Sequence, residues 1–242
     1  MKANDADLRI KLSAQREADA ANSFARSGIM RIADLFADEV AEVLHRHLET
    51  EIDWTRAVTQ GDEVWDLSPE LVAEIDGGKR TDLLAGLHSR ASDSFQFLFD
   101  SLIISDDSGA RKARGLLVDR LLEALNHPAS LDTFRAITGE PSVRLVNGQA
   151  TRYLPGHFLT SHDDGIDGED RVAAYVINLT KSWRPDWGGM LQFHNAAGDI
   201  PLALKPGFNT IHMFRVPQMH SVSYVAPYAA LPRYAITGWL RR

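Results

Sequence analysis

The chain has 242 residues, 44% of them apolar and 24% charged, which is the composition of an ordinary globular protein and excludes disordered or fibrous classes. Lys and Arg number 26 against 33 Asp and Glu, so the formal net charge of -7 argues against broad, sequence-independent binding to nucleic acid. There is no cysteine, so any metal must be held by imidazole and carboxylate groups rather than by thiolates.

The N-terminus runs directly into charged residues and lacks the apolar core of a signal peptide. No apolar run reaches the roughly 18 residues that a transmembrane helix needs. From these two features we expect a cytoplasmic protein with no membrane partner, and from the net charge we expect no nucleic-acid partner. No pattern in the sequence predicts an oligomeric state.

The first 141 residues predict mainly helices. Apolar residues recur at helical steps of three and four in the segments 40–48, 84–102, 117–125 and 131–138. Ser130 is predicted to cap the last of these helices, and Gly139 to end it. Short strands are expected at 29–32 and around Val58 and Val64.

From residue 142 the pattern changes to short runs rich in Val, Ile, Tyr, Phe and Thr, separated by turn residues. The runs are 143–146, 150–153, 172–179, 190–193, 210–214, 221–225 and 234–240. Short strands at this spacing predict a sandwich or barrel rather than alternating βαβ units. Since no linker or repeat interrupts the chain, we expect one domain over 1–242, with a helical support region at 1–141 and a β core at 142–242.

The sharpest local motif is Ser161-His162-Asp163-Asp164-Gly165. On a strand, residues two apart face the same side, so His162 and Asp164 could present an imidazole and a carboxylate to one point. A second histidine would complete the 2-His-1-carboxylate set that is diagnostic of non-heme Fe(II) oxygenases. By itself the motif also fits a solvated acidic turn, and the acidic run 163–170 predicts a solvated loop here.

Two downstream residues strengthen the metal-site interpretation. His220 starts an apolar run, and Arg233 stands thirteen residues later in another. An inward-facing arginine is costly without an anion, and a dicarboxylate co-substrate would supply one that a guanidinium grips bidentately. Viewed alone, Arg233 equally fits an outward-facing strand residue. His212 competes with His220 for the role of second histidine, and we favour His220 because of its spacing before the arginine strand.

Residues 142–242 resemble the Fe(II)/2-oxoglutarate-dependent dioxygenases, within the prolyl hydroxylase group. Besides the His-Asp motif, the matching segments are Arg152-Tyr153-Leu154-Pro155-Gly156, 171–179 leading to Trp183, Trp187-Gly188-Gly189-Met190-Leu191, His220-Ser221-Val222 and 233–239. The final strand is similar to that of the hypoxia-factor prolyl hydroxylases. The His-Asp-Asp motif and the Trp-Gly-Gly hairpin are equally similar to the branch that hydroxylates a ribosomal-protein proline.

The resemblance implies an α+β fold with a double-stranded β-helix, or jelly-roll, core behind N-terminal buttressing helices. It implies Fe(II) held by His162, Asp164 and His220 as the catalytic centre. Arg233 would bind the distal carboxylate of the co-substrate 2-oxoglutarate. O2 would be the second co-substrate, with ascorbate as an allowed auxiliary, and the products would be succinate, CO2 and a hydroxylated substrate.

The resemblance also suggests residues around this centre. Tyr153 corresponds to a tyrosine that lines the family's active site, and Arg171 to an arginine at the rim that helps to bind substrate in some members. His157 follows Pro155-Gly156 near the expected entrance and is a candidate for substrate contact, beside the plainer interpretation of a structural histidine.

Two positions depart from the family pattern. Asn178 stands where those prolyl hydroxylases place a tyrosine hydroxyl against the co-substrate, and its amide can still form hydrogen bonds. Ala235 stands where many members have serine, so Arg233 would be supported by Tyr153 or Thr237 instead. Neither departure changes the implied iron ligands, and both bear on the class of substrate.

Three functions therefore remain open from the sequence. The first is hydroxylation of a prolyl residue in a protein or peptide substrate. The second keeps the chemistry but acts on a free amino acid or another small metabolite, an alternative that Asn178 keeps open. The third is a non-catalytic, cupin-like module that binds a metal or ligand, which would not need open iron sites and a dicarboxylate anchor together.

Overall fold

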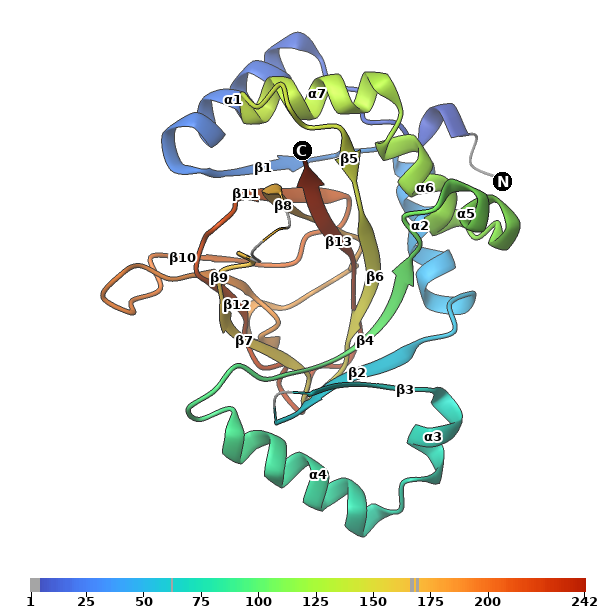
Figure 1. Cartoon of the computed structure of the whole chain (residues 1–242), viewed down its shortest axis with the longest axis vertical. Helices are drawn as coiled ribbons and strands as arrows, with labels where there is room; N and C mark the ends of the chain where they lie inside the picture. Colours follow the sequence, from blue (N-terminus) through green and yellow to red (C-terminus); the bar gives the residue numbers. More distant parts are fainter. Residues whose placement is uncertain (1–4, 62, 166–167, 169) are drawn as a thin grey trace.

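The structure is a computed structural model that describes residues 5–61, 63–165, 168 and 170–242, so part of the predicted acidic loop 163–170 lies outside the described residues. Its described strands form one curled antiparallel sheet in the order β1-β11-β8-β13-β6-β4-β7-β12-β9-β10, with β2, β3 and β5 attached at the side (Figure 1). The strands are β1 Ile29–Ala33, β2 Thr55–Gln60, β3 Glu63–Leu67, β4 Phe97–Ile104, β5 Leu145–Val146, β6 Gly148–Tyr153, β7 Phe158–His162, β8 Arg171–Asn178, β9 Leu191–Phe193, β10 Leu202–Leu204, β11 Thr210–Arg215, β12 His220–Val222 and β13 Arg233–Arg241.

Helices cover the outside of this curled sheet at two places. In Figure 1, α1, α7, α6 and α2 pack beside β1, β5 and β6, whereas α3 and α4 lie at the opposite end, next to the β2–β3 hairpin. The helices are α1 Ala14–Ser27, α2 Asp38–Thr50, α3 Pro69–Glu74, α4 Gly77–Arg90, α5 Ser108–Arg114, α6 Leu117–Leu125 and α7 Pro128–Thr138, with short 3₁₀ turns η1 Asp5–Asp7 and η2 Pro185–Trp187. No helix in the described part of the chain is long and apolar enough to cross a membrane.

The helix predicted over 84–102 is wrong in its second half. Helix α4 ends at Arg90, and 97–104 forms β4, which pairs with β6 and β7 along one edge and with β2 along the other. Leucines four residues apart share a face of a helix, but they also share a face of a strand when aromatic residues occupy the other face. In β4, Phe97-Leu98-Phe99 is buried on both faces of the sheet. Residues 1–141 therefore provide a central strand as well as helices.

Helix α7 begins earlier than the sequence predicts. Its N-cap is His127, whose Nδ1 accepts the Ala129 amide, and Pro128 occupies the first helical position, where its missing N–H costs nothing. Ser130 is instead buried inside the helix, with its hydroxyl donating to the Ala124 carbonyl. The predicted end at Gly139 is confirmed by its left-handed φ of 70°.

The other predicted strands are confirmed within a few residues, and the sequence missed α1, α3, α5, β7 and β10 as elements. The main apolar core joins the two parts of the chain. Phe24 of α1, Leu44 of α2 and Phe134 of α7 share one buried cluster with Ile177 of β8 and Ile236 of β13. The helices thus hold one face of the large sheet, while the short strands β7, β12 and β9 close the other side of the barrel (Figure 1).

Candidate metal centre

Strand pairing brings the two candidate histidines together. In the antiparallel β7–β12 pair, His220 at the start of β12 lies opposite His162 at the end of β7. Their ring centroids are 4.1 Å apart. Residues 58 positions apart in sequence thus face the same point because of the register between two short strands.

Asp164 reaches the same point from a turn rather than from the strand. Strand β7 ends at His162, and Asp164 has a left-handed φ of 62°, which aspartate tolerates better than most residues. The carboxylate of Asp163 accepts the Gly165 amide at 2.9 Å, and its carbonyl accepts the Gln218 amide at 3.2 Å. The alternation expected for a strand is therefore wrong at this position, although the two side chains do converge.

The three side chains form a compact cluster of potential ligand atoms. Oδ1 of Asp164 lies 3.4 Å from Nε2 of His162, and Oδ2 lies 3.5 Å from Nε2 of His220. One ligand atom from each residue lies within 4.8 Å of the others. His212 is not part of this cluster, so the geometry favours His220 as the second histidine.

Backbone carbonyls fix the orientation of both imidazoles. Nδ1 of His162 lies 3.0 Å from the Thr160 carbonyl, and Nδ1 of His220 lies 2.7 Å from the Gln218 carbonyl. Because a carbonyl only accepts, each Nδ1 carries the proton and, in the neutral ring, each Nε2 turns a lone pair toward Asp164. This is the tautomer that a metal ligand requires.

The protonation states agree with metal binding. Burial is the main cause that lowers the pKa of His220 to about 4, with the charge of His162 acting in the same direction. Burial alone would raise the pKa of Asp164, but the close contact with the His162 imidazole and the charge that His220 carries when protonated outweigh it and hold that pKa below its usual value. At neutral pH the cluster thus presents a neutral imidazole and a carboxylate at close range.

These residues fit a divalent transition metal. Two imidazole lone pairs and a carboxylate that converge without a proton between them repel one another, and a cation removes that repulsion. Two histidines and one carboxylate on one side leave the other coordination positions open, as in non-heme Fe(II) sites.

The predicted anion anchor lies in the same cavity. A cavity of about 80 Å³ is lined by His162, Asp164, His220 and Arg233, among others. Arg233 is only 2% exposed, and its Nε has no hydrogen-bond partner within the described residues. A buried guanidinium with an unpartnered donor is costly, so it points to an anionic ligand in this cavity.

Tyr153 supports the guanidinium from the neighbouring strand. It lies opposite Arg233 in the β6–β13 register, and the guanidinium carbon is 4.9 Å from the centre of the tyrosine ring. Burial raises the pKa of Tyr153 to about 12, even though the charge of Arg233 opposes this, so the phenol stays protonated. Thr237 also lines the cavity.

Asn178 lies on the same face of β8 as Ala174 and Val176, which line the cavity, but it is not itself among the lining residues. Its amide nitrogen donates to the carbonyls of Val176 and Thr210 and lies 3.4 Å from Nδ1 of His212, while its Oδ1 lacks a partner in the described chain. Burial lowers the pKa of His212 to about 3, and its Nε2 also lacks a partner there. Asn178 and His212 thus form a buried polar pair, a feature that no linear motif indicated.

The two predicted substrate contacts lie in different places. Arg171 donates to the Asp164 carbonyl at 3.1 Å and stacks 3.7 Å from the centre of the Trp239 ring, so it lies at the metal cluster. His157 lines a separate, larger cavity and is absent from the lining of the one that holds Arg233.

One residue at the cluster was missed by sequence analysis. Phe95 is 46% exposed, and its ring centre lies 5.2 Å from that of His162. It had been assigned to the helix predicted over 84–102, and nothing in its local pattern distinguishes it from a core residue.

The comparisons with known proteins agree with this geometry. Residues 148–241 match the model of a family described as the 2OG-Fe(II) oxygenase superfamily, and this range contains all three ligand candidates and Arg233. The C-terminal part of the chain is therefore similar to this superfamily. Its members imply Fe(II), 2-oxoglutarate and O2, which suit the donor set and the buried arginine described above.

Among curated proteins, the chain is similar to Prolyl 3-hydroxylase OGFOD1 of Mus musculus, with 27% identity over 227 residues. The match covers 88% of this chain and 41% of the relative, so the chain spans less than half of that protein's length. The chain is thus prolyl hydroxylase-like in sequence.

Solved structures show the same fold. A prolyl-4-hydroxylase of Pseudomonas putida matches with a TM-score of 0.57 at 17% identity, covering 93% of this chain and 98% of that one. A prolyl hydroxylase of Trichoplax adhaerens, in complex with a hypoxia inducible factor peptide fragment, matches with a TM-score of 0.54 at 16% identity, covering 94% and 89%. The predicted α+β jelly-roll architecture is confirmed.

Proposed function

We propose that the protein is an Fe(II)- and 2-oxoglutarate-dependent dioxygenase that hydroxylates a prolyl residue of a protein or peptide. The observation that carries the proposal is one cavity lined by both the His162–Asp164–His220 cluster and the buried cation of Arg233. A non-catalytic binding module would not need an open metal site and a dicarboxylate anchor in the same cavity. The match to prolyl hydroxylase relatives supports the substrate class.

Each residue has a defined task in this proposal. His162, Asp164 and His220 would hold Fe(II), which together with 2-oxoglutarate and O2 supplies the oxidising power for hydroxylation of a C–H bond, with release of succinate and CO2. Arg233 binds the distal carboxylate, and Tyr153 packs against its guanidinium. Apolar side chains of the same cavity, such as Leu191 and Val222, keep water away from the reacting groups.

An exposed aromatic side chain beside the metal cluster favours a polypeptide over a small metabolite. Phe95 is 46% exposed, and its ring centre lies 5.2 Å from that of His162, so it offers apolar contact to an extended chain that approaches from the surface.

The metal and co-substrate assignment is tested by anaerobic titration with Fe(II) and 2-oxoglutarate. We expect the weak visible charge-transfer band of a metal-chelated keto acid, and we expect Asp164→Asn to abolish it. Asp163→Asn is the matched control, because that side chain lies outside the cluster and an amide oxygen can still accept the Gly165 amide. A metal that binds without the band, or a band that survives Asp164→Asn, would overturn the assignment.

The substrate class is tested with a peptide library that carries a fixed proline between randomised flanks. We expect 2-oxoglutarate- and O2-dependent gain of one oxygen atom by mass spectrometry, with no gain when alanine replaces proline. Hydroxylation of free L-proline with no reaction on any peptide would instead support the small-metabolite function.

A further inference from the structure

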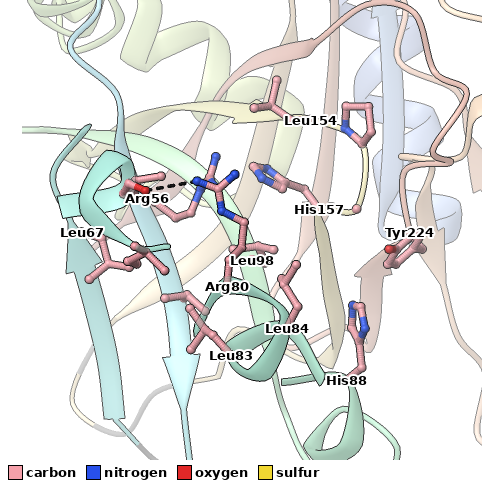
Figure 2. Close-up of a pocket in the computed structure, with 15 residues that line it drawn as sticks. Arg56, Leu67, Arg80, Leu83, Leu84, His88, Leu98, Leu154, His157 and Tyr224 are labelled. Atoms are coloured by element: carbon pink, nitrogen blue, oxygen red, sulfur yellow. Dashed lines mark hydrogen bonds between the residues drawn. The ribbon is translucent and has the colours of Figure 1, made fainter. Parts of the chain in front are cut away.

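A second and larger cavity lies away from the metal cluster. Its volume is about 360 Å³, within the range of pockets that bind small molecules. It is enclosed by β2, β4, helices α3 and α4, and the turn between β6 and β7 (Figure 2). None of the three metal-ligand candidates lines it.

The sheet itself separates the two cavities. Val58 and Leu98 belong to the apolar cluster on the α4 side of the sheet, together with Leu84 and Leu87. Their strand neighbours Ala57, Phe97 and Phe99 belong to the cluster on the inner side, and Phe99 lines the cavity of the metal cluster. Because successive strand residues face opposite sides, the larger cavity lies behind the wall of the metal site.

Most of this cavity has aliphatic walls. Its apolar lining includes Val58, Leu67, Val72, Leu83, Leu84 and Leu98. No carboxylate side chain is among the described residues that line it. The walls therefore suit a hydrocarbon group and offer no counter-charge to a cation.

One side of the cavity is cationic. Figure 2 shows the side chains of Arg56, Arg80 and His157 close together, with Leu83 and Leu84 below them. The Arg80 guanidinium donates to the Val72 carbonyl at 3.2 Å, and no ion pair of Arg80 is found in the part of the chain that the structure describes. Its charge is therefore not neutralised by a neighbouring carboxylate.

Arg56 adds to the positive charge. It binds the buried carboxylate of Asp100 at 2.9 Å, but Arg152 binds the same carboxylate at 2.7 Å. One carboxylate between two guanidinium groups leaves a net positive charge beside the Arg80 side of the cavity.

His157 provides a polar group that lacks a partner. Its side chain is 3% exposed, and its Nδ1 has no hydrogen-bond partner within the described residues. Burial is the main cause that lowers its pKa to about 4, so the ring is neutral at neutral pH. A buried polar atom without a partner is costly, and a polar group of a ligand would satisfy it.

From this arrangement we infer that the cavity between the sheet and helices α3 and α4 binds a small monocarboxylate with an aliphatic body. The carboxylate lies against the guanidinium of Arg80 and next to Arg56 and His157, and the hydrocarbon lies along the leucine and valine walls. Tyr224, at the opposite end in Figure 2, closes the cavity behind the hydrocarbon. This site is independent of the oxygenase chemistry proposed above.

The inference is tested by calorimetric titration of the full chain with octanoate near neutral pH. We expect saturable binding at one site, because the probe combines a carboxylate with a chain that fits the aliphatic walls. Octan-1-ol should bind at least about tenfold more weakly, since a hydrogen bond between charged groups contributes about a factor of ten or more.

Two matched charge variants locate the site. Arg80→Gln should weaken octanoate binding about tenfold or more, whereas Lys79→Gln removes an equal charge from the same helix turn without touching the cavity and should leave binding unchanged. Both residues are exposed, so both variants are expected to fold, and their thermal unfolding provides the check.

A third variant tests whether octanoate binds in the co-substrate pocket instead, because that pocket also attracts carboxylates. Octanoate should bind Arg233→Met as tightly as it binds the unaltered protein, and added 2-oxoglutarate should not displace it. Absence of octanoate binding at millimolar concentration, equal effects of the two charge variants, or loss of binding in Arg233→Met would each overturn the inference. None of these results would bear on the charge-transfer band that tests the oxygenase proposal.

Discussion

At the scale of single residues, Arg233 and His212 are polar groups buried at a cost to stability. Within the described residues, Nε of Arg233 and Nε2 of His212 are both buried without a hydrogen-bond partner. Each costs folding free energy that an apolar residue would not.

The first prediction concerns Arg233→Met. Without co-substrate, we expect the melting temperature to stay the same or rise, because an unpaired buried charge is replaced by an apolar side chain of similar length. The unaltered protein with a divalent metal should gain about 3 kcal/mol of stability at a 2-oxoglutarate concentration of about 100 times Kd, and the variant should lose this gain. Thermal unfolding with and without 2-oxoglutarate measures both effects. A large loss of stability without co-substrate would show that the guanidinium has a structural partner.

The second prediction concerns the pH dependence of stability through His212. Burial lowers the pKa of this imidazole from 6.5 to about 3, so between these values the unfolded chain binds a proton that the folded chain does not. The free energy of unfolding therefore falls as the pH drops below 6.5. From about pH 6.5 to about pH 5 the loss from this one group is about 2 kcal/mol. In His212→Asn, urea unfolding should show a shallower decline over the same interval, and an unchanged slope would contradict the burial of a neutral imidazole.

At the scale of elements, the turn between η2 and β9 packs closely against the backbone at Tyr224, and this contact joins two segments of the barrel wall. Gly188 has φ 70° and ψ -144°, and a Cβ placed there would meet the Tyr224 carbonyl oxygen at 2.0 Å. The Gly188 carbonyl also accepts the indole N–H of Trp183 at 2.9 Å. Gly198 has a similar φ of 85°, but among the described residues other than its chain neighbours no atom lies within 4 Å of a Cβ at that position.

The third prediction uses this contrast. Gly198→Ala carries only the backbone strain and should lower the free energy of unfolding by about 1–2 kcal/mol. Gly188→Ala adds a clash with the backbone and should lower it by about 2–4 kcal/mol. Urea denaturation of the two variants measures the difference, and equal losses would show that the approach of residue 224 to this turn is not tight.

At the scale of the whole molecule, helices and sheet share one core. Phe24 and Leu44 of the N-terminal helices are buried together with Ile177 and Ile236 of the large sheet. Strand β4 of the N-terminal part pairs with both β6 and β7, so the C-terminal strands alone would lose the strand that joins their two groups. We expect residues 1–242 to unfold as one unit.

The fourth prediction tests this expectation. Unfolding followed by far-UV circular dichroism and by tryptophan fluorescence should give coincident transitions. Phe24→Ala should shift both probes equally, by a loss of about 3–5 kcal/mol, although the five tryptophans all lie outside α1. Ile103→Ala is the control, because that side chain is 65% exposed and should change stability by about 0.5 kcal/mol or less. Separate transitions for the two probes would indicate two folding units.

The candidate chemistry could be predicted from residue types and their order in the chain. A chain without cysteine confined the metal ligands to histidine and carboxylate, and a short motif with one later histidine and one later arginine predicted a cluster that the tertiary structure brings together. The prediction was possible because His162 and Asp164 are close together in the chain, and because an isolated arginine in an apolar strand needs a buried anion.

Which groups face which cavity depends on the tertiary structure. Periodicity could not assign β4, since its leucines satisfy both helical spacing and alternation, and its pairing with β6, β7 and β2 joins residues far apart in the chain. The turn between β6 and β7 carries His157 to the far side of the sheet, and Asn178 contacts His212 because of the register between β8 and β11. Such register depends on contacts between distant segments, which no local pattern records.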